Sequence, residues 1–256
     1  AGPLVSAFWP GPLTVIVPRA AHVPLVASGG LDTVGIRVPA HPVALALVRA
    51  VGEPLAAPSA NAHTHISPTA AEHVVASLGD RVDLVLDAGP CRHGIESTVL
   101  DLSCDPPRVL RPGAASLGAL VSVNPRVTYG AMTVEDDGAR ASPGLASKHY
   151  APRARVSLVE SVSFEDALQS AREAGESFAA IVHSAGAGRS LRAYGEDSAV
   201  VVAVVLPQDA EGYARGLFAA LHAADAANAA HVLVERVPDE PAFWAVADRL
   251  KRAERR

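Results

Sequence analysis

Residues 33–52, TVGIRVPAHPVALALVRAVG, place a strand directly before a helix. Apolar residues alternate between Thr33 and Val38, which is typical of a strand with one buried face. Pro42 opens the helix where its missing N–H would have no partner anyway, and Gly52 ends it. Strand–helix units of this kind build α/β domains, so we expect an α/β fold.

The same alternation continues on both sides of this unit. Further strands are expected at residues 13–17, 55–57, 83–87, 97–102 and 108–110. Thr69 and Glu72 have capping-box spacing and predict a helix that ends at Gly79. The sequence therefore predicts a first α/β domain over residues 1–120.

A second regular pattern follows an irregular stretch. Residues 121–153 show no sustained period, and we interpret them as a linker or lid. Strands are then expected at 156–159, 178–183, 200–206 and 232–237, and helices at 164–173, 210–230 and 241–252. Gly186-Ala187-Gly188 lacks the third glycine of a dinucleotide fingerprint, so a simple turn is favoured. We expect a small second α/β domain over residues 154–256.

Composition excludes several classes of protein. Hydrophobic residues make up 49% of the chain, and the net charge of −5 disfavours stable nucleic-acid binding, which usually needs a basic face. Two cysteines, Cys91 and Cys104, give neither a disulfide framework nor a zinc pattern, which favours the cytoplasm. The longest apolar stretch, residues 199–206, is too short to span a membrane.

Polar residues cluster between an expected strand end and a helix start. Residues 57–61 read APSAN and residues 67–69 read SPT. Hydroxyls and free amides at a helix start suit a phosphate, although Ser67 or Thr69 could equally be a plain N-cap. Arg37 and Arg111 each lie near a strand end, where they could bind a carboxylate or phosphate or be ordinary surface residues.

Histidines also raise the question of a metal site. His63, His65 and His73 lie close together in the sequence, but no carboxylate or cysteine at close spacing completes a ligand set. We therefore predict no metal site.

Together, the short motifs resemble the Sua5/YrdC/YciO family. They occur in the family's order over nearly the whole chain: 8–14 (FWPGPLT), 34–39 (VGIRVP), 57–61, 67–69, 87–90 (DAGP), 96–99 (ESTV), 110–113 (LRPG), and 142–144 (SPG) with 149–152 (HYAP). The last motif and the trailing domain resemble the longer, two-domain Sua5 type. The resemblance implies a YrdC-like twisted mixed sheet with helices, incomplete at its N-terminus, then a long linker and a small Rossmann-like α/β domain.

The resemblance also implies a reaction, that of an L-threonylcarbamoyladenylate synthase. L-Threonine and bicarbonate form a carbamate that attacks the α-phosphate of ATP, releasing pyrophosphate and leaving threonylcarbamoyl-AMP. ATP is a substrate, with magnesium, and a separate tRNA threonylcarbamoyl transferase would use the product for tRNA modification. By position, the ATP contacts would be Thr33, Ser59, Ser67, Arg111 and Tyr150, and the threonine contacts Arg37, Ala57 and Ser97.

Two departures from the family pattern bear on activity. Family members carry a segment ahead of Phe8 with a cationic Lys-x-Arg pair, whereas the first cationic side chain here is Arg19. We therefore expect low activity from these residues alone, and a non-catalytic remnant that binds a nucleotide or a partner stays open as an alternative. Thr64 stands where the family usually has a glycine, so the loop loses that residue's backbone freedom.

Overall fold

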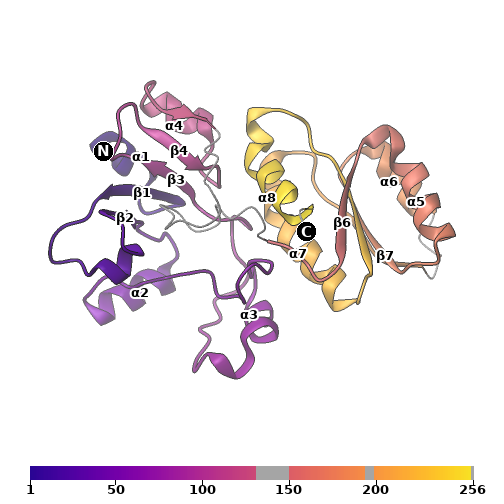
Figure 1. Ribbon diagram of the computed structural model, residues 1–256, viewed down its shortest axis with the longest axis horizontal. Coiled ribbons are helices and arrows are strands. Elements are labelled where there is room, and N and C mark those ends of the chain that lie inside the picture. The colour runs from indigo at the N-terminus through magenta and orange to yellow at the C-terminus, as the bar shows by residue number, and fades with distance from the viewer. Residues whose placement is uncertain (131–149, 194–198, 255–256) are drawn as a thin grey trace. The chain divides into compact units, whose positions relative to one another are not determined.

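The computed structural model describes residues 1–130, 150–193 and 199–254 (Figure 1). Backbone contacts divide the chain into two compact units, each built from two stretches. Unit 1 comprises Ala1–Pro58 and Glu96–Ser147, and unit 2 comprises Ser59–Ile95 and Lys148–Arg256. The expected motif at 142–144 and His149 lie outside the described residues. The domain boundaries at residues 120 and 153 remain predictions.

Unit 1 contains a five-stranded mixed sheet in the order β2-β1-β3-β4-β5. Its strands are β1 (Leu13–Pro18), β2 (Thr33–Ile36), β3 (Thr98–Asp101), β4 (Arg108–Arg111) and β5 (Thr128–Tyr129). β1 runs parallel to β3 and antiparallel to β2, and β4 runs antiparallel to β3 and parallel to β5. The mixed sheet is the one that the resemblance implied.

Helices α1 (Gly2–Phe8) and α4 (Leu117–Val123) pack with this sheet, and α2 (Pro42–Val51) and the short η1 (Leu25–Ser28) complete the unit. The core consists of apolar residues from both helices, from the sheet and from the residue before β5: Leu4, Leu13, Val15, Leu100, Val109, Leu120 and Val127. α2 has the expected bounds, and its C-cap Gly52 adopts the left-handed conformation at φ 75° that favours glycine.

Unit 2 contains a four-stranded parallel sheet in the order β6-β9-β7-β8. The strands are β6 (Arg155–Val159), β7 (Phe178–Val182), β8 (Val200–Val205) and β9 (His231–Glu235). Helices α5 (Phe164–Glu173) and α6 (Ala185–Ala193) cover one face, and α7 (Ala210–Ala226) and α8 (Trp244–Glu254) the other, as Figure 1 shows. This is the expected Rossmann-like arrangement of helices on both faces of a parallel sheet.

The stretch 59–95 adds α3 (Ala71–Leu78) and η2 (Gly79–Arg81) to unit 2, which also has the short η3 (Ser161–Ser163) and η4 (Pro241–Phe243). Ile66 is 2% exposed and lies in the same core cluster as Tyr150 and Phe218 of α7. Two segments far apart in the sequence therefore share one hydrophobic core.

Some local expectations were wrong. Residues 55–57 and 83–87 form no strand, and Leu84 is 75% exposed, so the apolar pattern there marks no buried face. Thr69 does not cap α3, whose N-cap is Ala70 without a side-chain hydrogen bond. The glycine pair at 186–188 lies inside α6, because the Ser184 hydroxyl accepts the Ala187 N–H at 3.1 Å and starts a helix.

The described residues include no helix that is both long and apolar enough to cross a membrane.

Candidate functional site

Arg111 and Ser97, predicted to contact different substrates, lie together in unit 1. Arg111 ends β4 and is 7% exposed, and its Nη2 donates to the Ser97 carbonyl at 2.9 Å and lies 3.4 Å from the Ser97 hydroxyl. The Ser97 hydroxyl is also 2.8 Å from the hydroxyl of Thr14 on β1. These contacts fix a buried guanidinium beside two hydroxyls, a set of donors suited to an anionic ligand.

Gly113 allows the chain after β4 to lie against the segment that carries Ser97. A Cβ atom at Gly113 would fall 2.4 Å from the Glu96 carbonyl oxygen and 2.5 Å from the Ser97 carbonyl carbon. The Ala114 N–H donates to the same Glu96 carbonyl at 3.1 Å. The glycine of the expected motif at 110–113 is therefore required by close backbone approach.

The remaining predicted residues of unit 1 lie at the two ends of β2 and after α2. Thr33 begins β2 and is half-buried, whereas Arg37 directly follows β2 and is exposed, as is Ala57. In the part of the chain that the structure describes, the Arg37 guanidinium has no hydrogen-bond or ion-pair partner. Its charge is thus available to a ligand carboxylate.

Ser59, Ser67 and Tyr150 belong to unit 2. Ser59 is exposed, whereas Ser67 is 6% and Tyr150 is 1% exposed. The Tyr150 ring packs against Phe218, with 5.5 Å between centroids, and the Arg249 guanidinium carbon lies 5.4 Å from the ring centroid. Tyr150 is held in the core of the unit, and its contact with ATP stays a prediction.

Thr64 confirms that its loop needs a glycine-like backbone. Its φ of 69° lies in the left-handed region, which is strained for a β-branched residue. Its carbonyl accepts the Ala151 N–H at 3.1 Å, which holds the loop against the segment around Tyr150.

Sequence reasoning missed a histidine contact at the segment 67–69. His222 of α7 stacks on His73 of α3 with 3.8 Å between ring centroids and 16° between planes, and its Nε2 lies 3.1 Å from the Ser67 carbonyl oxygen. His222 is 155 residues from Ser67, so no local pattern could reveal the contact. Within the described residues, no group of three or more His, Cys, Asp and Glu side chains could hold a metal ion.

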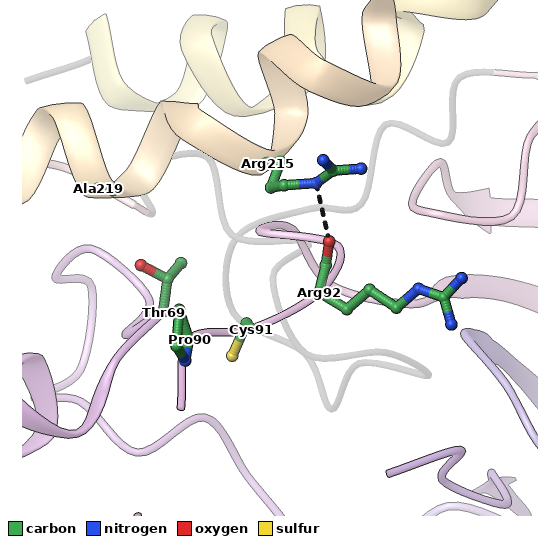
Figure 2. Close-up of a pocket in the computed structure, with 6 residues that line it drawn as sticks. All are labelled: Thr69, Pro90, Cys91, Arg92, Arg215 and Ala219. Carbon is green, nitrogen blue, oxygen red and sulfur yellow. Dashed lines mark hydrogen bonds between the residues drawn. The ribbon is translucent and has the colours of Figure 1, made fainter. Parts of the chain in front are cut away.

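A pocket of about 430 Å³ lies within unit 2 (Figure 2). Its lining residues come from the segments 67–69 and 90–92 and from α7: Thr69, Pro90, Cys91, Arg92, Arg215 and Ala219. The Cys91 N–H donates to the Thr69 carbonyl at 2.8 Å, and Arg215 Nε donates to the Arg92 carbonyl at 3.1 Å, drawn dashed in Figure 2. The predicted substrate residues are not among those that line it.

A buried carboxylate joins three strands of unit 2 at their carboxyl ends. Glu235 of β9 is fully buried and accepts the N–H groups of His183 and Ser184 at 2.7 and 2.9 Å and the Ser161 hydroxyl at 2.7 Å. The His183 Nδ1 is 2.9 Å away. Burial raises the pKa of Glu235, but these hydrogen bonds outweigh it and lower the pKa to about 2. The group is a structural anion with its acceptors occupied.

The two units and their motifs define a two-domain α/β protein, and two family models match the chain one after the other. Residues 1–113 match the Sua5/YciO/YrdC family, described as telomere recombination, and residues 114–254 match the threonylcarbamoyl-AMP synthase C-terminal domain. The chain therefore belongs to the Sua5/YciO/YrdC family, in its two-domain Sua5 form.

Several relatives resemble the chain over most of its length. It is 37% identical to a threonylcarbamoyl-AMP synthase of Pyrococcus abyssi over 98% of this chain and 72% of that one. A Bacillus subtilis threonylcarbamoyl-AMP synthase is 35% identical over 98% of this chain and 71% of its own length. The crystal structure of P. abyssi Sua5 complexed with L-threonine is 34% identical, with a TM-score of 0.86 over 98% of this chain and 72% of that one.

Proposed function

We propose that this chain carries out the L-threonylcarbamoyladenylate synthase reaction. L-Threonine and bicarbonate condense to a carbamate with loss of water. A carbamate oxygen then attacks the α-phosphorus of ATP, the bond to the β-phosphate oxygen breaks, and pyrophosphate leaves. The product, threonylcarbamoyl-AMP, is a mixed anhydride.

The main support for this proposal is the similarity to a solved relative. Both the sequence and the fold match P. abyssi Sua5 over 98% of the chain, and that protein was crystallised with L-threonine. A likeness over both domains supports the synthase rather than the alternative of a non-catalytic remnant, because it includes the segments that carry the substrate motifs.

For threonine, we propose contacts from Arg37, Ala57 and Ser97. The exposed Arg37 guanidinium, without a partner among the described residues, would neutralise the threonine carboxylate and set its direction. The Ser97 hydroxyl is already oriented by Thr14 at 2.8 Å, so it can meet a ligand with little further ordering.

For ATP, we propose contacts from Thr33, Ser59, Ser67, Arg111 and Tyr150. The buried Arg111 supplies a fixed positive charge, and the hydroxyl groups supply hydrogen bonds to phosphate oxygens. Catalysis of this kind depends on positioning and charge stabilisation rather than on proton transfer by a side chain. ATP would bind as its magnesium complex, and a tRNA threonylcarbamoyl transferase in the cytoplasm would receive the product.

The test is pyrophosphate release by the complete product of the gene that encodes this chain. We expect release only when ATP, threonine and bicarbonate are all present, and serine in place of threonine serves as the matched control. Release that is independent of threonine would contradict the proposal and indicate plain ATP hydrolysis.

A further inference from the structure

We propose that His222 of α7 is a positioning residue that holds the segment 67–69 in the geometry that binds ATP. This inference rests on the proposed function, because Ser67 is one of the residues proposed to contact ATP. It would give the C-terminal domain a direct part in substrate binding.

The contact between His222 and Ser67 has only one possible direction. The Ser67 carbonyl can only accept a hydrogen bond, so the His222 Nε2, 3.1 Å away, carries the proton and donates it. Ser67 itself is buried, with 6% of its surface exposed. Removal of His222 would leave a poorly hydrated carbonyl without this donor, which destabilises the observed position of the segment.

The stack on His73 fixes the orientation of the His222 ring. The Thr69 N–H donates to the His73 Nδ1 at 3.2 Å, so the His73 ring is itself bound to the segment 67–69. The two rings, 3.8 Å apart and nearly parallel, then join Thr69 to α7. The segment 67–69 is thus tied to α7 at both ends, at Ser67 directly and at Thr69 through His73.

Both rings are neutral at neutral pH, which makes the close stack possible. Burial lowers the pKa of His222 to about 4, with the hydrogen bond to Ser67 opposing it and His73 adding to it. Burial also lowers the pKa of His73, against the opposing charge of Glu72. Two uncharged imidazoles pack without repulsion. His222 keeps the Nε2 proton that it donates to Ser67, and His73 keeps the unprotonated Nδ1 that accepts the Thr69 N–H.

At its helix end, the segment is held by backbone contacts of Thr69. α3 begins at Ala71 after an N-cap, Ala70, that gives no side-chain hydrogen bond. The Thr69 carbonyl accepts the Cys91 N–H at 2.8 Å, which secures one point. The His222 contact holds the segment on the Ser67 side of Pro68.

The experiment compares three variants in the complete gene product: His222→Leu, His222→Gln and Ala223→Gln. Leucine fills similar space without a donor, whereas glutamine keeps an N–H near the position of Nε2. Ala223 is exposed on the same helix and provides the matched control. Calorimetry gives the Kd for ATP and for threonine, hydrogen exchange reports on residues 67–73 without substrate, and thermal unfolding verifies that each variant is folded.

We expect His222→Leu to raise the Kd for ATP about fivefold, in line with the loss of one hydrogen bond, and to speed exchange at 67–73. The Kd for threonine should stay unchanged, and His222→Gln and Ala223→Gln should resemble the parent protein. The inference is wrong if His222→Leu binds ATP normally, or if His222→Gln is as impaired as His222→Leu. Failure of the parent protein to bind ATP would instead overturn the proposed function, and the inference with it.

Discussion

Arg111 donates a hydrogen bond from Nη2 to the backbone carbonyl of Ser97 at 2.9 Å, with the Ser97 hydroxyl 3.4 Å away. A residue proposed to bind ATP therefore holds a residue proposed to bind threonine. In the proposed function, this buried contact would couple the two substrates, and a change at either residue should affect both ligands.

Replacement of Arg111 by lysine tests this coupling. Arg111→Lys keeps the charge but loses the planar fork that reaches Ser97. We expect the KM values for ATP and for threonine both to rise about tenfold, since hydrogen bonds to charged groups contribute about 1.5–3 kcal/mol. Steady-state kinetics with each substrate varied in turn measures both values. A rise for ATP alone would show that the contact with Ser97 does not transmit to threonine.

Replacement of Arg37 should weaken the binding of threonine only. Its guanidinium is exposed, and the described residues offer it no partner, so Arg37→Ala removes the proposed contact with threonine without breaking an internal one. We expect threonine affinity to fall at least tenfold, given about 1.5–3 kcal/mol for a charge-assisted hydrogen bond, with ATP affinity nearly unchanged. Titration calorimetry measures both, with Arg92→Ala as an exposed-arginine control. A larger effect on ATP would assign Arg37 to the other ligand.

Gly113 should tolerate no side chain. Gly113→Ala would place a Cβ atom 2.4 Å from the Glu96 carbonyl oxygen, so backbone must shift and stability should fall by about 2 kcal/mol. Gly118→Ala is the matched control, because nothing lies within 4 Å of its Cβ position and alanine favours the helix α4. Denaturant unfolding compares the two variants. Equal stability would mean that the observed approach to Glu96 is absent in solution.

The lowered pKa of Glu235 predicts that the protein loses stability in acid. Its folded-state pKa of about 2 lies below the usual value of 4.5, so its contribution to the free energy of unfolding is present above pH 4.5 and is lost as the pH falls towards 2. The shift corresponds to roughly 3 kcal/mol. Unfolding free energies measured over this range should fall less steeply in Glu235→Gln than in the parent protein. Parallel slopes would contradict the lowered pKa.

Much of the fold follows from local sequence signals. α5 begins and ends where its apolar spacing predicted, at Phe164 and Glu173, and α2 lies between Pro42 and Gly52 as expected. The segment 83–87 alternates like a strand, yet Leu84 and Leu86 are exposed. The prediction failed because a short alternating run does not say whether a partner strand exists. α6 was missed because its two glycines disfavour a helix, and the Ser184 cap was not considered.

The candidate site could be predicted only in part. The motifs located Ser97 and Arg111, which the antiparallel pairing of β3 and β4 brings together. The partners Thr14 and His222 were missed, because neither lies near its contact in the sequence: Thr14 is 83 residues from Ser97, and His222 is 155 from Ser67. Contacts at such separations depend on the packing of whole elements, which local patterns do not encode.

The most direct test of the account is mass spectrometry of the product formed with ¹³C-labelled bicarbonate, threonine and ATP. The complete gene product should form threonylcarbamoyl-AMP that carries the label in its carbamoyl group, in amounts equal to the pyrophosphate released. Formation of AMP and pyrophosphate without a labelled threonine adduct would contradict the account.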